Sequence, residues 1–287
     1  MLTLQLHAQK STRDRISRLT TGLGLLLFTH MALAFSVFPI DAAQSLKWGS
    51  NVNGTPGGIV TWGFIPPGTQ GDPSYCGAAC AGQSLSSINI ENFPNGGYTL
   101  TALTDLSSRI TAAFDKWSAV ADIHFVGPNA DGGLAINDVG AIAPQIRIGV
   151  FAFSAGGGAV GFAPPPNGGT GAGDIIFDAN SFYAHQPGSE GDLFPAPSTA
   201  PNDFDSLLLH EMGHALGLAH PNPNDGSCPV MQVGAACNGR INRELDADDI
   251  AGAQFLYGGP VPVPVPTAIW MFGSALAAVG FARRRTA

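Results

Sequence analysis

One string of residues, HEMGHALGLAH at 210–220, restricts what this chain can fold into more than any other feature. His210 and His214 are four residues apart, so a helix would project both imidazoles from one face, about one turn apart. That spacing suits two nitrogen ligands of one zinc ion, and Glu211 stands beside the first of them. The pattern therefore predicts a helix that carries part of a metal site.

The residues after His214 predict a third ligand. Gly217 stands where the helix must end, because glycine adopts the positive φ of a helix terminator without strain. The chain can then turn and bring His220 back to the same ion. Three protein ligands leave one coordination position open, which is typical of a catalytic zinc site, and Glu211 could reach a water molecule in that position.

Strand and helix patterns fill the remaining sequence. Apolar residues at helical spacing predict an amphipathic helix within 101–120, and 245–258 predicts a last helix that begins at an Asp246 cap. Asn202 or Asp203 could cap the helix of the histidine motif. Short β-branched and aromatic runs predict strands at 57–64, 122–126, 145–153, 158–163 and 174–178.

The four cysteines of the chain are expected to form disulfides, because the chain begins with an export signal. Three pairings are possible, and we prefer the local one, which joins Cys76 to Cys80 and Cys228 to Cys237. The first pair lies in a Gly-, Pro- and Ser-rich insertion from Ile65 to about Leu100, which we expect to be a surface loop. A Pro- and Ser-rich loop is also expected at 182–201.

The N-terminal residues have the features of a secretory signal peptide. Basic residues precede an apolar run that ends in the small-residue pattern ALA at 32–34. Cleavage after Ala34 or after Ala43 would release the mature chain. A membrane anchor is the alternative, although the run is short for a span.

The C-terminal residues 260–287 combine a VPVPVP linker, an apolar stretch and a final cluster of three arginines. This tail resembles the PEP-CTERM sorting signals of Gram-negative bacteria. The resemblance implies a transient anchor in the inner membrane, removal of the tail by exosortase-type sorting machinery, and release toward the cell surface or extracellular matrix. A permanent single-span anchor is the alternative.

The stretch between these two ends is strongly acidic. Many aspartates and glutamates oppose a short set of basic residues, namely Lys47, Arg109, Lys116, Arg147, Arg240 and Arg243. Such a surface repels polyanions, so we expect neither nucleic acid nor anionic lipid as a partner.

The extended motif H-E-x-x-H-x-x-G-x-x-H is the metzincin signature, and the chain resembles the matrixin-like branch of that clan. Met231 matches the Met-turn, which provides an apolar floor beneath the metal. The likeness covers most of residues 45–259 and implies one peptidase domain at 44–259. The implied fold is α+β, with a twisted mixed β-sheet, an active-site helix, an amphipathic backing helix and a C-terminal helix.

The resemblance also bears on further metal ions. Vertebrate matrixins carry a second, structural zinc, but Gly161 and Ile176 stand where two of its histidine ligands would be. We therefore expect a single catalytic zinc. Asp174 and Asp178 flank a strand that we expect at the sheet edge, and their oxygens could bind calcium. Two surface aspartates without a ligand are the alternative.

These features predict a secreted zinc-dependent endopeptidase, acting as a monomer on extracellular or matrix proteins. His210, His214 and His220 would hold the zinc, and Glu211 would act as general base toward the zinc-bound water. The substrate would lie extended along the edge strand near 174–178, and residues after Met231 would wall the pocket for the side chain that follows the cut.

Two non-catalytic alternatives and one enzymatic alternative compete with this prediction. An adhesion protein that keeps the fold would have no need of Glu211, and a zinc scavenger would carry His- or Cys-rich tracts, which this sequence lacks. An amidase that acts on a non-protein matrix component stays open.

Overall fold

The computed structural model describes residues 35–77, 80–85, 88–92, 98–100, 103–136, 138, 144–166, 171–194, 202–221, 227–233 and 237–261. The apolar run of the expected signal peptide lies outside these residues. The expected sorting tail does so too, from residue 262 onward. Within the described ranges, no helix is both long and apolar enough to span a membrane.

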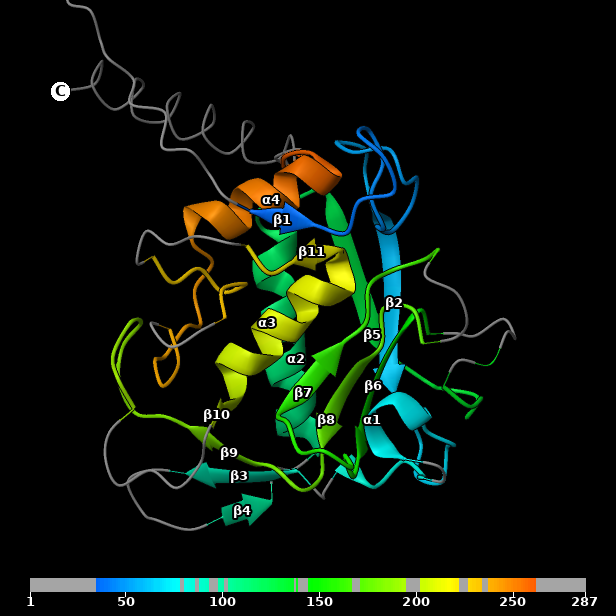
Figure 1. The fold of residues 1–287 in the computed structure, drawn as a ribbon, viewed down its shortest axis with the longest axis vertical. Helices are drawn as coiled ribbons and strands as arrows, with labels where there is room; N and C mark the ends of the chain where they lie inside the picture. Colours follow the sequence, from blue (N-terminus) through cyan, green and yellow to red (C-terminus); the bar gives the residue numbers. More distant parts are fainter. Residues whose placement is uncertain are drawn as a thin grey trace, which may run out of the picture. The chain divides into compact units, whose positions relative to one another are not determined.

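A five-stranded mixed sheet forms the centre of the fold, in the order β5-β2-β6-β8-β7 (Figure 1). Neighbouring strands are parallel except β7, which runs antiparallel to β8. The expectation that 174–178 forms the sheet edge is wrong, because β7 pairs along the outer side of β8 and is itself the edge. The strands are β2 (Gly58–Phe64), β5 (Ile123–Asn129), β6 (Ile146–Phe151), β7 (Ala159–Gly161) and β8 (Ile175–Asp178).

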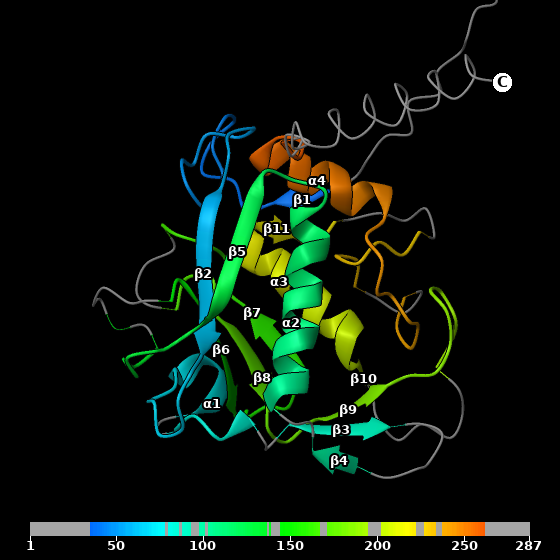
Figure 2. The same cartoon turned by 180° about the vertical axis from the view of Figure 1, so that it is seen from behind.

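Two helices, α2 (Leu103–Ser118) and α3 (Phe204–Leu216), share the main apolar core with this sheet. Helix α2 packs against α3, behind it in Figure 1 and in front of it in Figure 2. The rings of Trp62 on β2 and Phe114 on α2 lie 5.7 Å apart in this core. Burial of one such side chain contributes about 2 kcal/mol to the stability of the fold. A stripe of apolar residues along one face of α2 is buried in this way and attaches the helix firmly to its neighbours. The buried residues of the stripe are Leu106, Ile110, Ala113, Phe114 and Trp117.

Strand β8 shows that both faces of the sheet are buried. Its side chains alternate in direction, so Ile175 and Phe177 belong to the main core, whereas Ile176 belongs to a second apolar cluster. That cluster includes Tyr75 of α1 (Pro73–Cys76), which lies in the insertion after β2. This end of the insertion is therefore a second layer against the sheet, and not only the surface loop expected from its composition.

A smaller four-stranded sheet has the order β10-β9-β3-β4, and three of its strands, β9, β3 and β4, lie in segments that we expected to be loops. Strands β3 and β9 are parallel and come from distant parts of the chain, so neither carries a local signal for the other. Strand β10 runs directly into α3. The strands are β3 (Asn89–Asn92), β4 (Tyr98–Leu100), β9 (Phe182–His185) and β10 (Asn202–Asp203).

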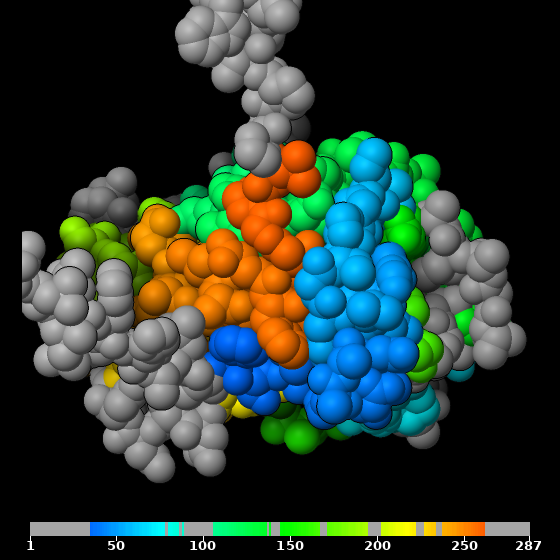
Figure 3. Space-filling model, turned by 90° about the horizontal axis from the view of Figure 1, so that it is seen from above, coloured from blue at the N-terminus to red at the C-terminus, as the bar shows by residue number. Residues whose placement is uncertain are grey.

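The first described residues join the last helix and the end of α3. Strand β1 (Ser36–Val37) pairs antiparallel with β11 (Leu218–Ala219). The ring of Phe35 lies 5.3 Å from that of Phe255 in α4 (Ala247–Tyr257). Figure 3 shows the N-terminal segment, in blue, against α4, in orange.

Candidate metal centre

Helix α3 has well-defined ends, which fix the direction of its side chains. Asp203 is the N-cap and accepts a hydrogen bond from the Ser206 amide at 3.0 Å. The helix ends at Gly217, whose φ of 106° lies in the left-handed region that favours glycine. Of the two caps that the sequence allows, Asn202 and Asp203, the structure has the second, and Gly217 ends the helix as expected.

Two side chains from outside α3 satisfy the carbonyl groups of its last turn. Trp48 Nε1 donates to the Ala215 carbonyl at 2.8 Å, and the Tyr257 hydroxyl donates to the Leu216 carbonyl at 2.6 Å. The same hydroxyl accepts from the Trp48 amide at 3.2 Å. Because the last carbonyls of a helix have no partner within it, these bonds hold the end of α3 that carries His214.

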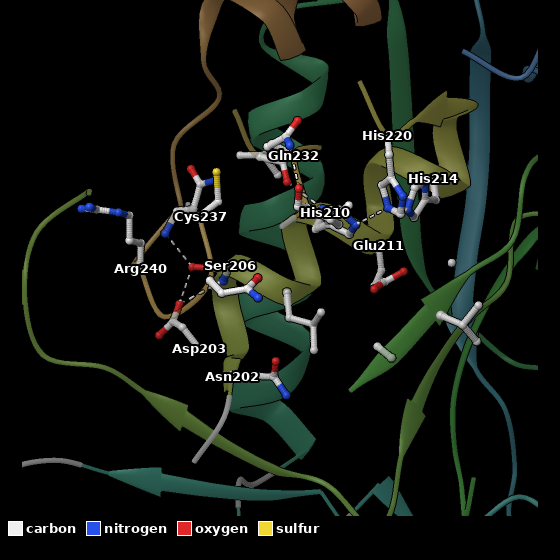
Figure 4. Close-up of a pocket in the computed structure, with 18 of the residues that line it drawn as sticks. Asn202, Asp203, Ser206, His210, Glu211, His214, His220, Gln232, Cys237 and Arg240 are labelled. Carbon is white, nitrogen blue, oxygen red and sulfur yellow. Dashed lines mark hydrogen bonds between the residues drawn. The ribbon is translucent and has the colours of Figure 1, made fainter. Parts of the chain in front are cut away.

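The three histidines of the motif bring their Nε2 atoms together (Figure 4). His220 Nε2 lies 3.1 Å from His210 Nε2 and 2.9 Å from His214 Nε2. Tetrahedral zinc–nitrogen bonds place two nitrogens roughly 3.3 Å apart, so this donor set fits one zinc ion. His210 and His214 come from α3, and His220 follows β11 directly.

Backbone carbonyls orient two of these imidazoles. His210 Nδ1 lies 2.7 Å from the Val230 carbonyl oxygen, and His214 Nδ1 lies 2.8 Å from that of Leu218. Since a carbonyl only accepts, the proton resides on Nδ1 and each Nε2 keeps its lone pair for a metal. Burial lowers the pKa of His210 to about 4 and that of His214 to about 3, so both are held in the neutral form that binds metals.

Glu211 lies beside the histidines and lines the same cleft. It is 5% exposed, and burial raises its pKa to about 7, opposed by a hydrogen bond from the Gly161 amide. Gly161 belongs to β7, and a Cβ at this position would overlap with the Glu211 carbonyl oxygen. Glycine therefore allows the edge strand to approach α3 closely enough to orient the carboxylate.

Met231 packs against α3 at Gly213, between the first two histidines of the motif. A Cβ on Gly213 of α3 would overlap with the Met231 sulfur, so glycine in the histidine motif makes room for this side chain. Asp249 accepts hydrogen bonds from the amides of Val230 at 2.7 Å and Met231 at 3.0 Å. A third bond, from the Asp246 amide, lies at 3.0 Å, so one buried carboxylate holds the turn.

The cleft that contains these residues has a volume of about 810 Å³. It runs from the histidines along α3 to Asp203 at the start of the helix (Figure 4). Residues of β7 line one side, and residues of the described stretches 230–233 and 237–242 line the other. Phe38, which sequence reasoning missed, also lines the cleft, and its ring lies 6.0 Å from that of His214.

Both disulfides have the local pairing preferred from the sequence. Cys76 is bonded to Cys80 in the insertion, and Cys228 is bonded to Cys237. Cys237 lines the cleft, so the second disulfide belongs to the wall of the candidate site.

The structure does not bring Asp174 and Asp178 together. Asp174 directly precedes β8 and Asp178 ends it, so the two residues are about 13 Å apart along the extended chain. Asp174 is buried and accepts the Arg147 amide at 3.0 Å, and burial raises its pKa well above the usual range. Asp178 accepts the Phe153 amide at 2.9 Å. The two carboxylates therefore do not form one calcium site.

Comparisons with known proteins point the same way as this geometry. The model of the family described as matrixin matches residues 97–258. Metalloendoproteinase 1 of Glycine max is 30% identical over 151 residues, which cover 53% of this chain and 45% of that protein. Matrix metalloproteinase-16 of Homo sapiens is 35% identical over 116 residues, covering 40% of this chain and 17% of that protein.

A bacterial protein has a comparable sequence identity to this chain. Karilysin of Tannerella forsythia is 32% identical over 108 residues, which cover 38% of this chain and 19% of that protein. In all three comparisons, the chain spans less than half the length of the curated relative.

Proposed function

Because this chain belongs to the matrixin family, we propose that it is a zinc-dependent endopeptidase that hydrolyses internal peptide bonds. The observation that supports this most directly is the convergence of three imidazole Nε2 atoms beside the buried Glu211, all in one open cleft. Metal ligands without a neighbouring base would suit a structural metal site equally well.

His210, His214 and His220 would hold the zinc ion, and their donor set fits it, as described above. A bound zinc supplies Lewis-acid polarisation of a carbonyl oxygen and lowers the pKa of a water molecule. The carbonyls of Val230 and Leu218 keep two of the imidazoles in the required tautomer.

Glu211 would accept the proton of the attacking water and then deliver it to the nitrogen of the departing amine. The Gly161 amide orients its carboxylate, and α3 places it one residue after the first histidine. The carboxylate therefore lines the same cleft as the histidines that would hold the zinc.

The substrate would pair with β7. Among the described strands, the outer side of β7 pairs with no other strand, and its residues line the cleft. An extended peptide could add to this edge by backbone hydrogen bonds, which bind many sequences with little regard to side chains. This replaces the earlier expectation that β8 is the binding strand.

We place the start of the catalytic domain at Phe35. The Phe38 amide donates to the Gly217 carbonyl at 3.1 Å, and β1 pairs with β11 directly before the third histidine. A signal peptide cut after Ala34 keeps these contacts, whereas a cut after Ala43 would remove them. The domain would therefore extend from Phe35 to about Gly259.

We further propose that the protein is exported as a monomer and carries one zinc. The tail at 260–287 would be a PEP-CTERM-type signal, read by exosortase-type machinery, that directs it to the cell surface or matrix of a Gram-negative bacterium. Mass determination of the secreted form tests this, since a retained tail is incompatible with removal by that machinery.

The function is tested by incubating an unstructured protein with the purified, zinc-loaded chain, beside Glu211→Ala. We expect internal cleavage by the parent, loss of cleavage with a zinc chelator, and recovery with added zinc. Glu211→Ala should keep its zinc and lose nearly all turnover. If the zinc-loaded parent leaves unstructured proteins intact, the endopeptidase function is wrong, and zinc loss by Glu211→Ala would show that its role is misassigned.

A further inference from the structure

The wall of the cleft opposite β7 is anchored at both of its ends. At the metal end, Asp249 holds the amides of Val230 and Met231. At the far end, the wall pairs with another loop, since the Phe194 amide donates to the Gly239 carbonyl at 2.7 Å. Further pairing between 191–192 and residue 241 extends this anchor.

The disulfide between Cys228 and Cys237 ties the middle of this wall. Its two residues are nine positions apart, and Cys237 lies between the metal end and the paired end of the wall. Asn242 reinforces the tie, because its side-chain amide donates to the carbonyls of Cys228 and Pro229, both at 3.0 Å. The covalent bond therefore joins Cys237, which lies between the two anchors, to Cys228, which lies just before Val230.

The described residues of the wall between the two anchors face the cleft. Gln232, Val233, Cys237 and Asn238 all line it, and Val233 is 46% exposed. Figure 4 labels Gln232 and Cys237 among the residues that line the cleft together with His210. A displacement of this stretch would thus change the width of the cleft beside the metal ligands, while the ligands themselves stay on α3 and after β11.

We propose that the Cys228–Cys237 disulfide sets the width of the cleft and thereby restricts which substrate side chains enter beside the metal. This proposal rests on the proposed endopeptidase function. A covalently fixed wall loses little freedom when a substrate binds, so it lowers the cost of binding for side chains that fit and excludes those that require the wall to move.

The test compares two serine double variants of the zinc-loaded chain. Cys228→Ser with Cys237→Ser removes the wall disulfide, and Cys76→Ser with Cys80→Ser removes the disulfide in the insertion as the matched control. Each is given a mixture of peptides, and the residues on both sides of every cut are read by mass spectrometry. Steady-state kinetics on one cleaved peptide give kcat and KM, and zinc content is measured for each variant.

Loss of the wall disulfide should broaden the set of side chains at the cut and raise KM about five- to tenfold, with kcat changed less than about twofold. One zinc per chain should remain. The control should keep the parental cleavage profile and KM. An unchanged profile in the wall variant, or an equal change in the control, overturns the proposal.

Val233→Ala keeps the test decisive if the wall variant does not fold. It shortens a side chain of the wall without touching the disulfide, and Val52→Ala, at a residue of similar exposure outside the cleft, is its control. Val233→Ala should admit larger side chains at the cut. If it leaves the profile unchanged, the wall does not select. An inactive parent refutes the endopeptidase function itself, and an active parent with unchanged variants refutes only this proposal.

Discussion

Asp249→Asn is the substitution that best tests how the turn beneath the metal is held. Asp249 is 1% exposed, and its two oxygens accept three backbone amides. Oδ2 accepts those of Val230 and Asp246, and Oδ1 accepts that of Met231. Asparagine keeps one acceptor oxygen, so at best two of the three amides keep their partner.

The magnitude follows from the amide that is left without an acceptor. A buried donor that loses its partner costs about 1–3 kcal/mol of unfolding free energy. The Val230 carbonyl also orients His210, so a looser turn should weaken zinc binding about tenfold, as other changes behind a metal ligand do. Asp249→Ala leaves all three amides without acceptors and should be more destabilising than Asp249→Asn.

Urea unfolding of the zinc-free chain gives the loss of stability, and competition with a chromophoric chelator gives the zinc affinity. Asp115→Asn, at an exposed position of α2, is the control and should change the unfolding free energy by less than about 0.5 kcal/mol. The reasoning is refuted if Asp249→Asn is as stable as this control. Lower stability with unaltered zinc affinity would refute the link from the turn to His210.

Three further substitutions test other contacts of the site. Gly161→Ala should displace β7 from α3 and lower kcat/KM about a hundredfold while zinc content is retained; a parental rate would contradict the close approach. Tyr257→Phe removes the hydroxyl that donates to the Leu216 carbonyl in the last turn of α3, and it should lower the free energy of unfolding by about 1–3 kcal/mol. An unchanged melting temperature would show that this hydroxyl does not stabilise the end of α3. Phe38→Ala should weaken zinc binding in a chelator competition, whereas Ile40→Ala, at an exposed position, should not.

Local patterns in the sequence predict much of the candidate site. The spacing of His210 and His214 follows from the 3.6-residue period of a helix, and Gly217 marks a position that only glycine occupies without strain. The Asp246 cap and the buried stripe of α2 are equally local, since cap residues and helical periodicity act within a few turns. Such features depend on neighbours along the chain, so they are visible before any fold is known.

The pairing of the strands could not be predicted from the sequence. The run at 174–178 indicates a strand, but its place inside the sheet does not follow from the run, because the pairing of β7 along β8 depends on both segments and not on either one alone. The parallel pairing of β3 with β9 has the same character. A period of two residues defines a strand's faces and contains no information on which strand lies beside it.

The residues that support the metal ligands were decided by tertiary structure alone. Val230 and Leu218 act through backbone carbonyls, which every residue possesses, so their identity gives no signal. The ring of Phe38 lies near that of His214, although the two residues are far apart in the sequence, because β1 pairs with β11. The sequence by itself determined the candidate ligands and the candidate base, whose proposed chemistry resides in their side chains. The fold decided their surroundings, because these consist of backbone groups and long-range contacts that acquire a function only once the chain is packed.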